Sequence, residues 1–294
     1  MSKNLNDIVI TTALRTPIGK YRGKLASYQA HELGSKIIIN LLNNSKVSPN
    51  DIDEIIIGQV LTSNTGQNSA RQAALKSGIP IEKTAYLINQ VCGSGLRSIV
   101  SAYQSLKARD ANIIIAGGQE SMTNCDKDVM LKDGLIDAYN QYHMGVTAEN
   151  VAEKWNISRY QQDQFALESQ QKTQEAIKKN KFKQEIISDL ISEDEHPRKD
   201  ISLESLSSLK AVFKENGTVT PGNSSGINDG AAGVLIMRRE EAEKRNLKPL
   251  VKIVSWASCG VEPSLMGSGP IPSSRKALEK ASWNIKDLDL VESN

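Results

Sequence analysis

Residues 85–95 read Ala85-Tyr86-Leu87-Ile88-Asn89-Gln90-Val91-Cys92-Gly93-Ser94-Gly95. The first four residues predict a short buried strand. The apolar residues that follow predict one face of an amphipathic helix, because they recur at helical spacing: Leu96, Ile99, Val100 and Tyr103. The glycines between strand and helix permit a tight turn and the close approach of a substrate. This stretch therefore predicts a strand, a turn that carries a cysteine, and a helix.

Cys92 is the candidate nucleophile of the chain. A thiol at such a turn faces N–H groups without partners and the positive end of the helix dipole, and both favour the thiolate. An isolated cysteine beside apolar residues is more often an inert core thiol. The adjacent Gly-Ser-Gly turn argues against that interpretation, because a passive core residue does not require glycines beside it. A dinucleotide-binding turn fits less well, because Ser98 stands where a third glycine is wanted and no acidic residue follows at the required distance.

The same alternation of strands and helices extends on both sides of this unit. Continuous apolar runs predict buried strands at 8–10, 55–58 and 112–118, and residues 35–42 and 69–76 predict helices. Apolar runs that do not alternate with polar residues are typical of a parallel sheet covered on both faces. We therefore expect an α/β fold, with the site at the carboxyl ends of the strands.

Changes of composition divide the chain. Residues 1–121 form the first α/β domain, and a returning segment, 222–249, carries a further strand. The polar residues 122–221 predict an inserted, mostly helical loop domain, in which Ser158 opens a capped helix that reaches about Lys178.

Residues 250–294 begin a second α/β pattern, with a strand at 250–257, a helix at 273–283 and a strand at 288–292. A domain with two strands cannot bury both faces of a sheet. We therefore interpret 250–294 as the incomplete start of a C-terminal domain.

Composition excludes several classes of function. The net charge of +2 and the aromatic content of 4% argue against a nucleic-acid partner. No apolar run reaches the length of a membrane span, and the first residues lack the features of a signal peptide. The three cysteines have neither paired spacing nor neighbouring ligands, which argues against a disulfide framework and a metal site. We expect a cytoplasmic protein.

Five segments, taken together and in order, resemble the thiolase family, the acetyl-CoA acetyltransferases. The segments span nearly the whole chain and lie at 66–73, 89–95, 143–149, 222–230 and 267–272. A ketoacyl synthase of the same superfamily is the nearest rival, but His143-Met144-Gly145 and the context of Glu149 favour a thiolase. The resemblance implies a layered αβαβα fold with two similar halves and a loop domain inserted in the first half.

The resemblance also implies roles for individual residues. Cys92 would carry the acyl group as a thioester, and its backbone N–H would serve the first oxyanion hole. His143 and Met144 would lie beside the pantetheine arm and the acyl chain. The positions that line the coenzyme A site in the family are Leu135, Arg198, Ser205, Phe213, Ser225 and Met266. Asn294 aligns with an asparagine that positions a water for the enolate. No cofactor or metal is implied, and the substrates are coenzyme A thioesters.

The implied reaction is the Claisen condensation of two acetyl-CoA to acetoacetyl-CoA, and its reverse. The histidine base and second cysteine of the family do not occur in residues 1–294, and Cys125, Cys259, His31 and His196 stand in other contexts. We therefore expect a C-terminally truncated thiolase that is weak or inactive alone. The alternatives are one part of a split enzyme and a non-catalytic, dimerising thiolase remnant. The segment between Met122 and Leu135 is much shorter than in tetrameric thiolases, so the resemblance implies a homodimer rather than a tetramer.

Overall fold

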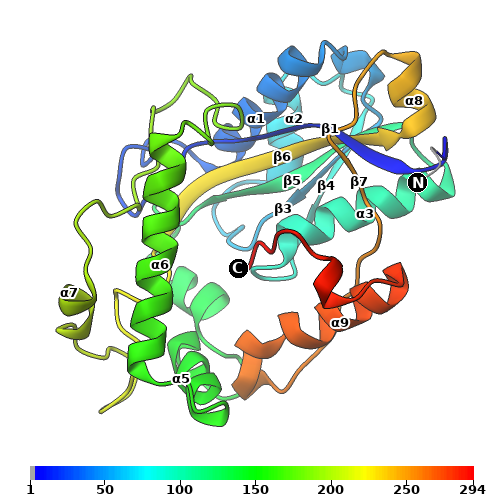
Figure 1. Cartoon of the computed structure of the whole chain (residues 1–294). Coiled ribbons are helices and arrows are strands. Elements are labelled where there is room, and N and C mark those ends of the chain that lie inside the picture. Colours follow the sequence, from blue (N-terminus) through cyan, green and yellow to red (C-terminus); the bar gives the residue numbers. More distant parts are fainter. Residues whose placement is uncertain (1–3) are drawn as a thin grey trace.

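The computed structural model describes residues 4–294. Its centre is one seven-stranded sheet with the strand order β4-β3-β5-β6-β1-β7, in which β2 pairs with β6 (Figure 1). The strands are β1 (Ile8–Arg15), β2 (Gly19–Lys20), β3 (Glu54–Gly58), β4 (Thr84–Ile88), β5 (Ile113–Ser121), β6 (Asn228–Arg238) and β7 (Val251–Lys252). The expected α/β fold class is confirmed.

The sheet is mixed, and the prediction of a parallel sheet was wrong for half of it. β3 pairs in parallel with β4 and with β5, whereas β6 runs antiparallel to both β5 and β1. Continuous apolar runs report that a strand is buried on both faces, and they carry no information on its direction. The direction of β6 follows from the chain path, because segment 122–227 begins and ends at the same edge of the sheet, where Ser121 pairs with Asp229.

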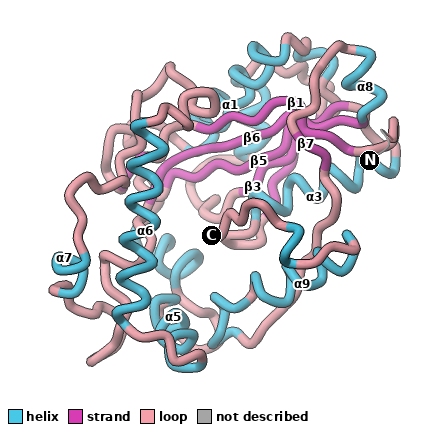
Figure 2. The backbone as a smooth tube through the Cα atoms, in the orientation of Figure 1, coloured by secondary structure: helices cyan, strands magenta, loops and turns pink. Residues whose placement is uncertain are grey.

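Helices cover both faces of the sheet (Figures 1 and 2). α1 (Ala30–Ser45) and α2 (Ser69–Lys76) pack on one face, where residues such as Leu33 and Leu41 join one apolar cluster with Ile55 and Leu235. α3 (Ser94–Ala108) packs on the opposite face, where Ala102 and Leu106 meet apolar residues of the central strands. Burial of these apolar side chains is the main favourable contribution to the fold.

Two details of the strand–turn–helix unit differ from the prediction. β4 is an edge strand and is half-exposed, so it is not the buried strand that its sequence predicted. The buried face of α3 consists of Ser94, Ser98, Ala102 and Leu106, whereas Leu96 is 75% exposed. Small residues face the sheet because the helix lies close to it: a Cβ added to Gly58 would lie 2.4 Å from the carbonyl carbon of Ser94.

Residues 122–227 contain α4 (Lys127–Val129), the π-helical turn η2 (Met130–Leu135), α5 (Met144–Lys154), α6 (Arg159–Lys178) and α7 (Leu203–Ser207). The predicted capped helix is confirmed, because Ser158 and Gln161 form a capping box and α6 ends at Lys178. Much of this segment is held by polar contacts, such as those that Asp163 accepts from Arg159 (2.7 Å) and Asn223 (2.9 Å). The proposed domain boundaries stay predictions.

After β6 the chain forms α8 (Arg239–Lys244), η3 (Pro263–Ser268), α9 (Pro270–Ala281) and η4 (Ile285–Asp287); η1 (Pro49–Asp51) precedes β3. The predicted helix at 273–283 is confirmed as α9. Of the predicted strand at 250–257 only β7 forms, and residues 288–292 form no strand. A strand requires a neighbouring strand for its backbone groups, and none of the strands in residues 4–294 pairs with 288–292.

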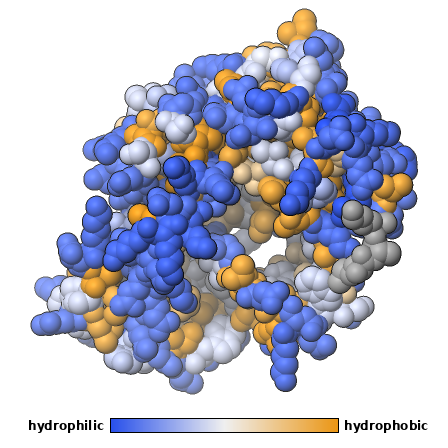
Figure 3. Space-filling view, turned by 45° about the horizontal axis from the view of Figure 1, so that its top comes forward, coloured by the Kyte–Doolittle hydropathy of each residue, from blue (hydrophilic) through white to orange (hydrophobic). Residues whose placement is uncertain are grey.

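The surface shows apolar side chains beside an open hollow near the middle of the molecule (Figure 3). In residues 4–294, no helix combines the length and the apolar character that a membrane crossing requires.

Candidate active site

Cys92 lies in the turn between β4 and α3, two residues before the first residue of the helix, and its side chain is exposed. The N–H of Gly93 donates to Gln90 O (3.1 Å) and that of Ser94 to Val91 O (3.0 Å). The N–H of Cys92 donates to no other group of the described chain, so it is free to stabilise an oxyanion. This geometry fits a nucleophile, and the role of Cys92 as the nucleophile stays a prediction.

The carboxyl ends of three strands meet beneath this turn. Asn89 follows β4, and its Nδ2 approaches Val60 O, which follows β3, at 3.5 Å. Glu120 lies near the end of β5, and its Oε2 accepts hydrogen bonds from the N–H groups of Val60 (2.9 Å) and Leu61 (3.3 Å). The candidate nucleophile therefore stands at the edge of the sheet where α/β proteins bind ligands.

Glu120 is a buried titratable group that the sequence reasoning missed. Burial raises the pKa of Glu120 to about 7, although hydrogen bonds from Val60, Leu61 and Ser121 favour the ionised form. Its Oε1 has no partner in the described part of the chain. A carboxylic acid at the end of the apolar run of β5 is the signal that could have revealed it.

His143 opens α5 and is the cap of that helix. Its Nδ1 accepts a hydrogen bond from the Gly145 N–H at 3.0 Å, so the neutral ring carries its proton on Nε2. Burial lowers the pKa of His143, which favours that neutral ring. The ring stacks on Phe213 with centroids 4.7 Å apart, and a Cβ on Gly145 would lie 2.2 Å from Phe213 Cγ. Only glycine leaves room for this stack.

The other expected pocket residues gather around the start of α5. Leu135 precedes Ile136, which forms a β-bridge with His143, and Met144 is the half-buried first residue of the helix. η3 packs on α5, where Asn150 Nδ2 donates to Ser264 O at 3.0 Å, and it carries Met266, which is 42% exposed.

The remaining expected residues lie apart and are exposed. Arg198 donates to Pro221 O (3.3 Å), and Ser205 donates its hydroxyl to Ser202 O (2.8 Å) within the capping box of α7. Ser225 is exposed at the turn before β6. Asn294 is exposed, and its side chain forms no hydrogen bond with residues 4–293. A joint role for these residues needs a ligand that spans them.

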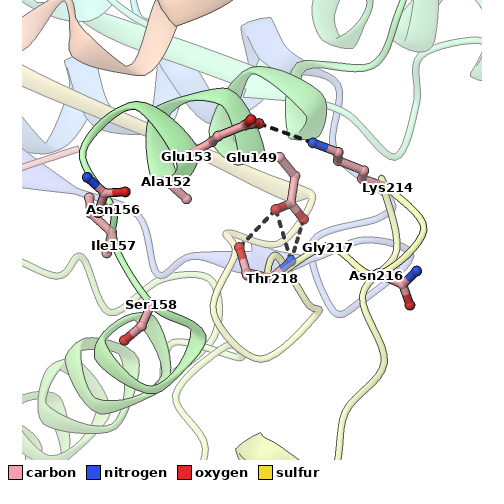
Figure 4. A pocket seen from close by; sticks show the side chains of 10 residues that line it. All are labelled: Glu149, Ala152, Glu153, Asn156, Ile157, Ser158, Lys214, Asn216, Gly217 and Thr218. Atoms are coloured by element: carbon pink, nitrogen blue, oxygen red, sulfur yellow. Dashed lines mark hydrogen bonds and ion pairs between the residues drawn. The ribbon is translucent and has the colours of Figure 1, made fainter.

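Glu149 is a second buried carboxylate, only 4% exposed, that was not among the expected site residues (Figure 4). It accepts hydrogen bonds from Val219 N (2.7 Å), Thr218 N (2.8 Å) and Thr218 Oγ1 (2.8 Å). Burial opposes ionisation, but these bonds outweigh it and hold the pKa of Glu149 below its ordinary value. Glu149 thus fixes the segment that follows Phe213.

A cavity of about 400 Å³ opens at the C-terminal end of α5 (Figure 4). Its lining consists of Glu149, Ala152, Glu153, Asn156, Ile157, Ser158, Lys214, Asn216, Gly217 and Thr218. None of the expected site residues lines it. Because its lining lacks a nucleophilic thiol and the hydrogen bonds of Glu149 are already made, this cavity is not the candidate active site.

The sequence matches family models over most of its length. Residues 8–128 and 124–240 match the model described as "Thiolase, N-terminal domain", and residues 247–294 match "Thiolase, C-terminal domain". The chain belongs to the thiolase family. The resemblance carried by the five segments is therefore confirmed.

Relatives and a solved structure agree with this assignment. The thiolase chain is 48% identical to an acetyl-CoA acetyltransferase of Paracoccus denitrificans, over 97% of this chain and 80% of that protein. It is 43% identical to a cytosolic acetyl-CoA acetyltransferase of Mus musculus, over 100% and 81%. The crystal structure of the acetyl-CoA acetyltransferase of Bacillus anthracis superimposes with a TM-score of 0.93 at 35% identity, over 98% of this chain and 80% of that one. The thiolase-like fold is therefore confirmed.

Proposed function

We propose that the chain is an acetyl-CoA acetyltransferase whose own residues carry out acyl transfer onto Cys92. The Cys92 thiol loses its proton as the sulfur attacks the carbonyl carbon of acetyl-CoA, the bond between that carbon and the coenzyme sulfur breaks, and the coenzyme A thiolate leaves and takes up a proton in its place. The product is an acetyl thioester on Cys92. In the condensation a proton leaves the α-carbon of a second acetyl-CoA, a bond forms between that carbon and the carbonyl carbon of the acetyl group, and the bond from that carbonyl carbon to the Cys92 sulfur breaks. The products are acetoacetyl-CoA and the regenerated thiol, and the reaction is reversible.

One observation carries the proposal: an exposed thiol stands at the start of α3, and the N–H of the same residue donates to no group within residues 4–294. That N–H can stabilise the negative charge on the carbonyl oxygen in the tetrahedral intermediate. The relatives that cover nearly all of this chain are acetyl-CoA acetyltransferases by name, which supports acetyl-CoA as the acyl donor.

Condensation also needs a base that removes an α-proton from the second acetyl-CoA. His31 is buried, and the Nδ1 of His143 is used as a helix cap. His196 Nε2 faces Ile227 O at 3.4 Å. We therefore assign to residues 4–294 the acylation of Cys92 and assign none of these histidines as the base.

We propose that Leu135, His143, Met144, Phe213 and Met266 contact the pantetheine arm and acyl chain. The polar residues Arg198, Ser205 and Ser225 would meet the nucleotide end, because a guanidinium suits phosphate or stacking on a ring. The expected water-binding role of Asn294, the homodimer and the cytoplasmic location stay predictions. The half-exposed edge strand β4 supports dimerisation, since an unpaired edge is a template for pairing.

The test is single-turnover acetylation. The chain is mixed with isotopically labelled acetyl-CoA, quenched in acid and digested, and the label is located by mass spectrometry. We expect one acetyl group on the peptide that contains Cys92, none in Cys92→Ser, and unchanged labelling in Cys259→Ser, which removes a thiol far along the sequence. Label on another cysteine, or no label on the wild-type chain, would refute the proposal.

A further inference from the structure

Ser94 carries a buried hydroxyl directly under the turn that presents Cys92. The residue is 3% exposed, and its Oγ accepts a hydrogen bond from the Gln90 N–H (2.9 Å) and donates one to Val91 O (2.5 Å). The backbone N–H of Ser94 also donates to Val91 O, at 3.0 Å. One serine therefore binds the peptide group that precedes Gln90 and the peptide group that follows Val91, so it spans the two residues before Cys92.

Val91 has a backbone conformation that its side chain disfavours. Its φ of +48° lies in the left-handed region, which a β-branched residue rarely adopts. Such a conformation persists only when neighbouring groups hold it, and such residues gather at functional sites. Asn89 also stabilises this conformation, because its Oδ1 accepts a hydrogen bond from the Val91 N–H at 2.9 Å.

The start of α3 is itself fixed, so Ser94 is a firm support for this turn. A Cβ on Gly58 would lie 2.4 Å from the carbonyl carbon of Ser94 and 2.6 Å from the nitrogen of Gly95. One turn later Ser98, which is fully buried, donates to Gly117 O of β5 at 2.7 Å. The end of β3 and the middle of β5 thus hold the helix against the sheet.

We propose that the Ser94 hydroxyl, assisted by the Asn89 amide, is a positioning element that keeps Val91 left-handed and thereby fixes the sulfur and N–H of Cys92 ahead of α3. Without these hydrogen bonds Val91 relaxes to φ below zero, which rotates the following peptide group and moves the sulfur and the oxyanion donor together. This inference rests on the proposed acyl transfer and names the residues that prepare its nucleophile.

The test compares Ser94→Ala with Ser98→Ala, a control that removes a buried serine from the same face of α3. Two rates are measured across pH: alkylation of Cys92 by iodoacetamide, and acetylation of Cys92 by acetyl-CoA. We expect Ser94→Ala to slow acetylation by about tenfold and to alter the pH profile of alkylation. We expect Ser98→Ala to lower stability but to slow acetylation much less than Ser94→Ala does, because it removes a hydrogen bond of the helix and leaves those of the turn intact.

A suppressor variant separates positioning from general damage. Glycine adopts positive φ without penalty, so Val91→Gly combined with Ser94→Ala is expected to recover most of the lost rate. Asn89→Ala removes an exposed side chain, folds even if Ser94→Ala does not, and is expected to slow acetylation as well. Rates at the wild-type level in Ser94→Ala and Asn89→Ala, or no recovery in the double variant, would overturn the inference.

The two proposals fail in different ways. If the wild-type chain is not acetylated but Ser94→Ala still alters the alkylation profile of Cys92, the proposed function fails and the positioning role stands. If the wild-type chain is acetylated and neither variant differs from it, the function stands and the positioning role fails.

Discussion

Replacement of Glu149 should reveal how the segment after Phe213 is held. Glu149→Ala leaves without an acceptor the N–H group of Val219, which is buried, and that of Thr218, which is half-buried. Hydrogen bonds to a charged group contribute about 1.5–3 kcal/mol each, and they are not additive here because they share one carboxylate. We expect Glu149→Ala to lower the free energy of unfolding by about 3–5 kcal/mol.

Two further variants make this expectation specific. Glu149→Gln keeps one acceptor oxygen for both N–H groups, and the Thr218 hydroxyl can turn to accept a hydrogen bond from the new amide. The free energy of unfolding should therefore fall by only about 1–2 kcal/mol. Glu153→Ala, one turn later on α5, removes an ion pair with Lys214 in which the Glu153 side chain is 73% exposed, so its loss should stay below about 1 kcal/mol.

The assay is urea denaturation of the three variants, with hydrogen exchange at the Val219 amide as a local readout. We expect faster exchange in Glu149→Ala and exchange at the wild-type rate in Glu153→Ala. Because the folded-state pKa of Glu149 is lowered, its contribution is present above its unfolded pKa and is lost as pH falls through the folded value. Equal stability losses in Glu149→Ala and Glu153→Ala would show the reasoning to be wrong.

Three other predictions concern the site. Cys92 should react with iodoacetamide faster than Cys125, because burial and nearby carboxylates raise the pKa of the Cys125 thiol. Peptide mapping after brief labelling measures the two rates, and faster labelling of Cys125 would contradict the prediction. Gly145→Ala should lower the free energy of unfolding by about 1–3 kcal/mol despite the helix propensity of alanine, because the new methyl group meets the Phe213 ring. An unchanged midpoint of urea denaturation would argue against the stack of His143 on Phe213. Burial raises the pKa of Glu120 to about 7, so its contribution to stability is present below pH 4.5 and is lost as pH rises through 7. The loss amounts to about 3 kcal/mol, and the difference between wild type and Glu120→Gln in denaturation from pH 4.5 to 7.5 measures it; a difference independent of pH excludes it.

The elements and the turn that carries Cys92 could be predicted from the sequence because their signals are local. The capping box of α6 lies within four residues, and the cysteine turn lies between an apolar run and a helical repeat. Helix α2 follows the predicted range residue for residue. The motifs were also sufficient for the thiolase family, since they are short and occur in order along the chain.

Only the tertiary structure decided which faces and partners these elements have. Leu96 has the periodicity of a buried residue yet is exposed, because the close approach of β3 selects the face of α3 that carries Ser94 and Ser98. Glu149 and Thr218 lie 69 positions apart, and no local pattern pairs them. The sequence by itself determined the local elements, the turn that carries Cys92 and the family. The fold determined the antiparallel half of the sheet, the buried carboxylates and the serine that supports Val91, because each depends on segments that meet only after the chain has folded.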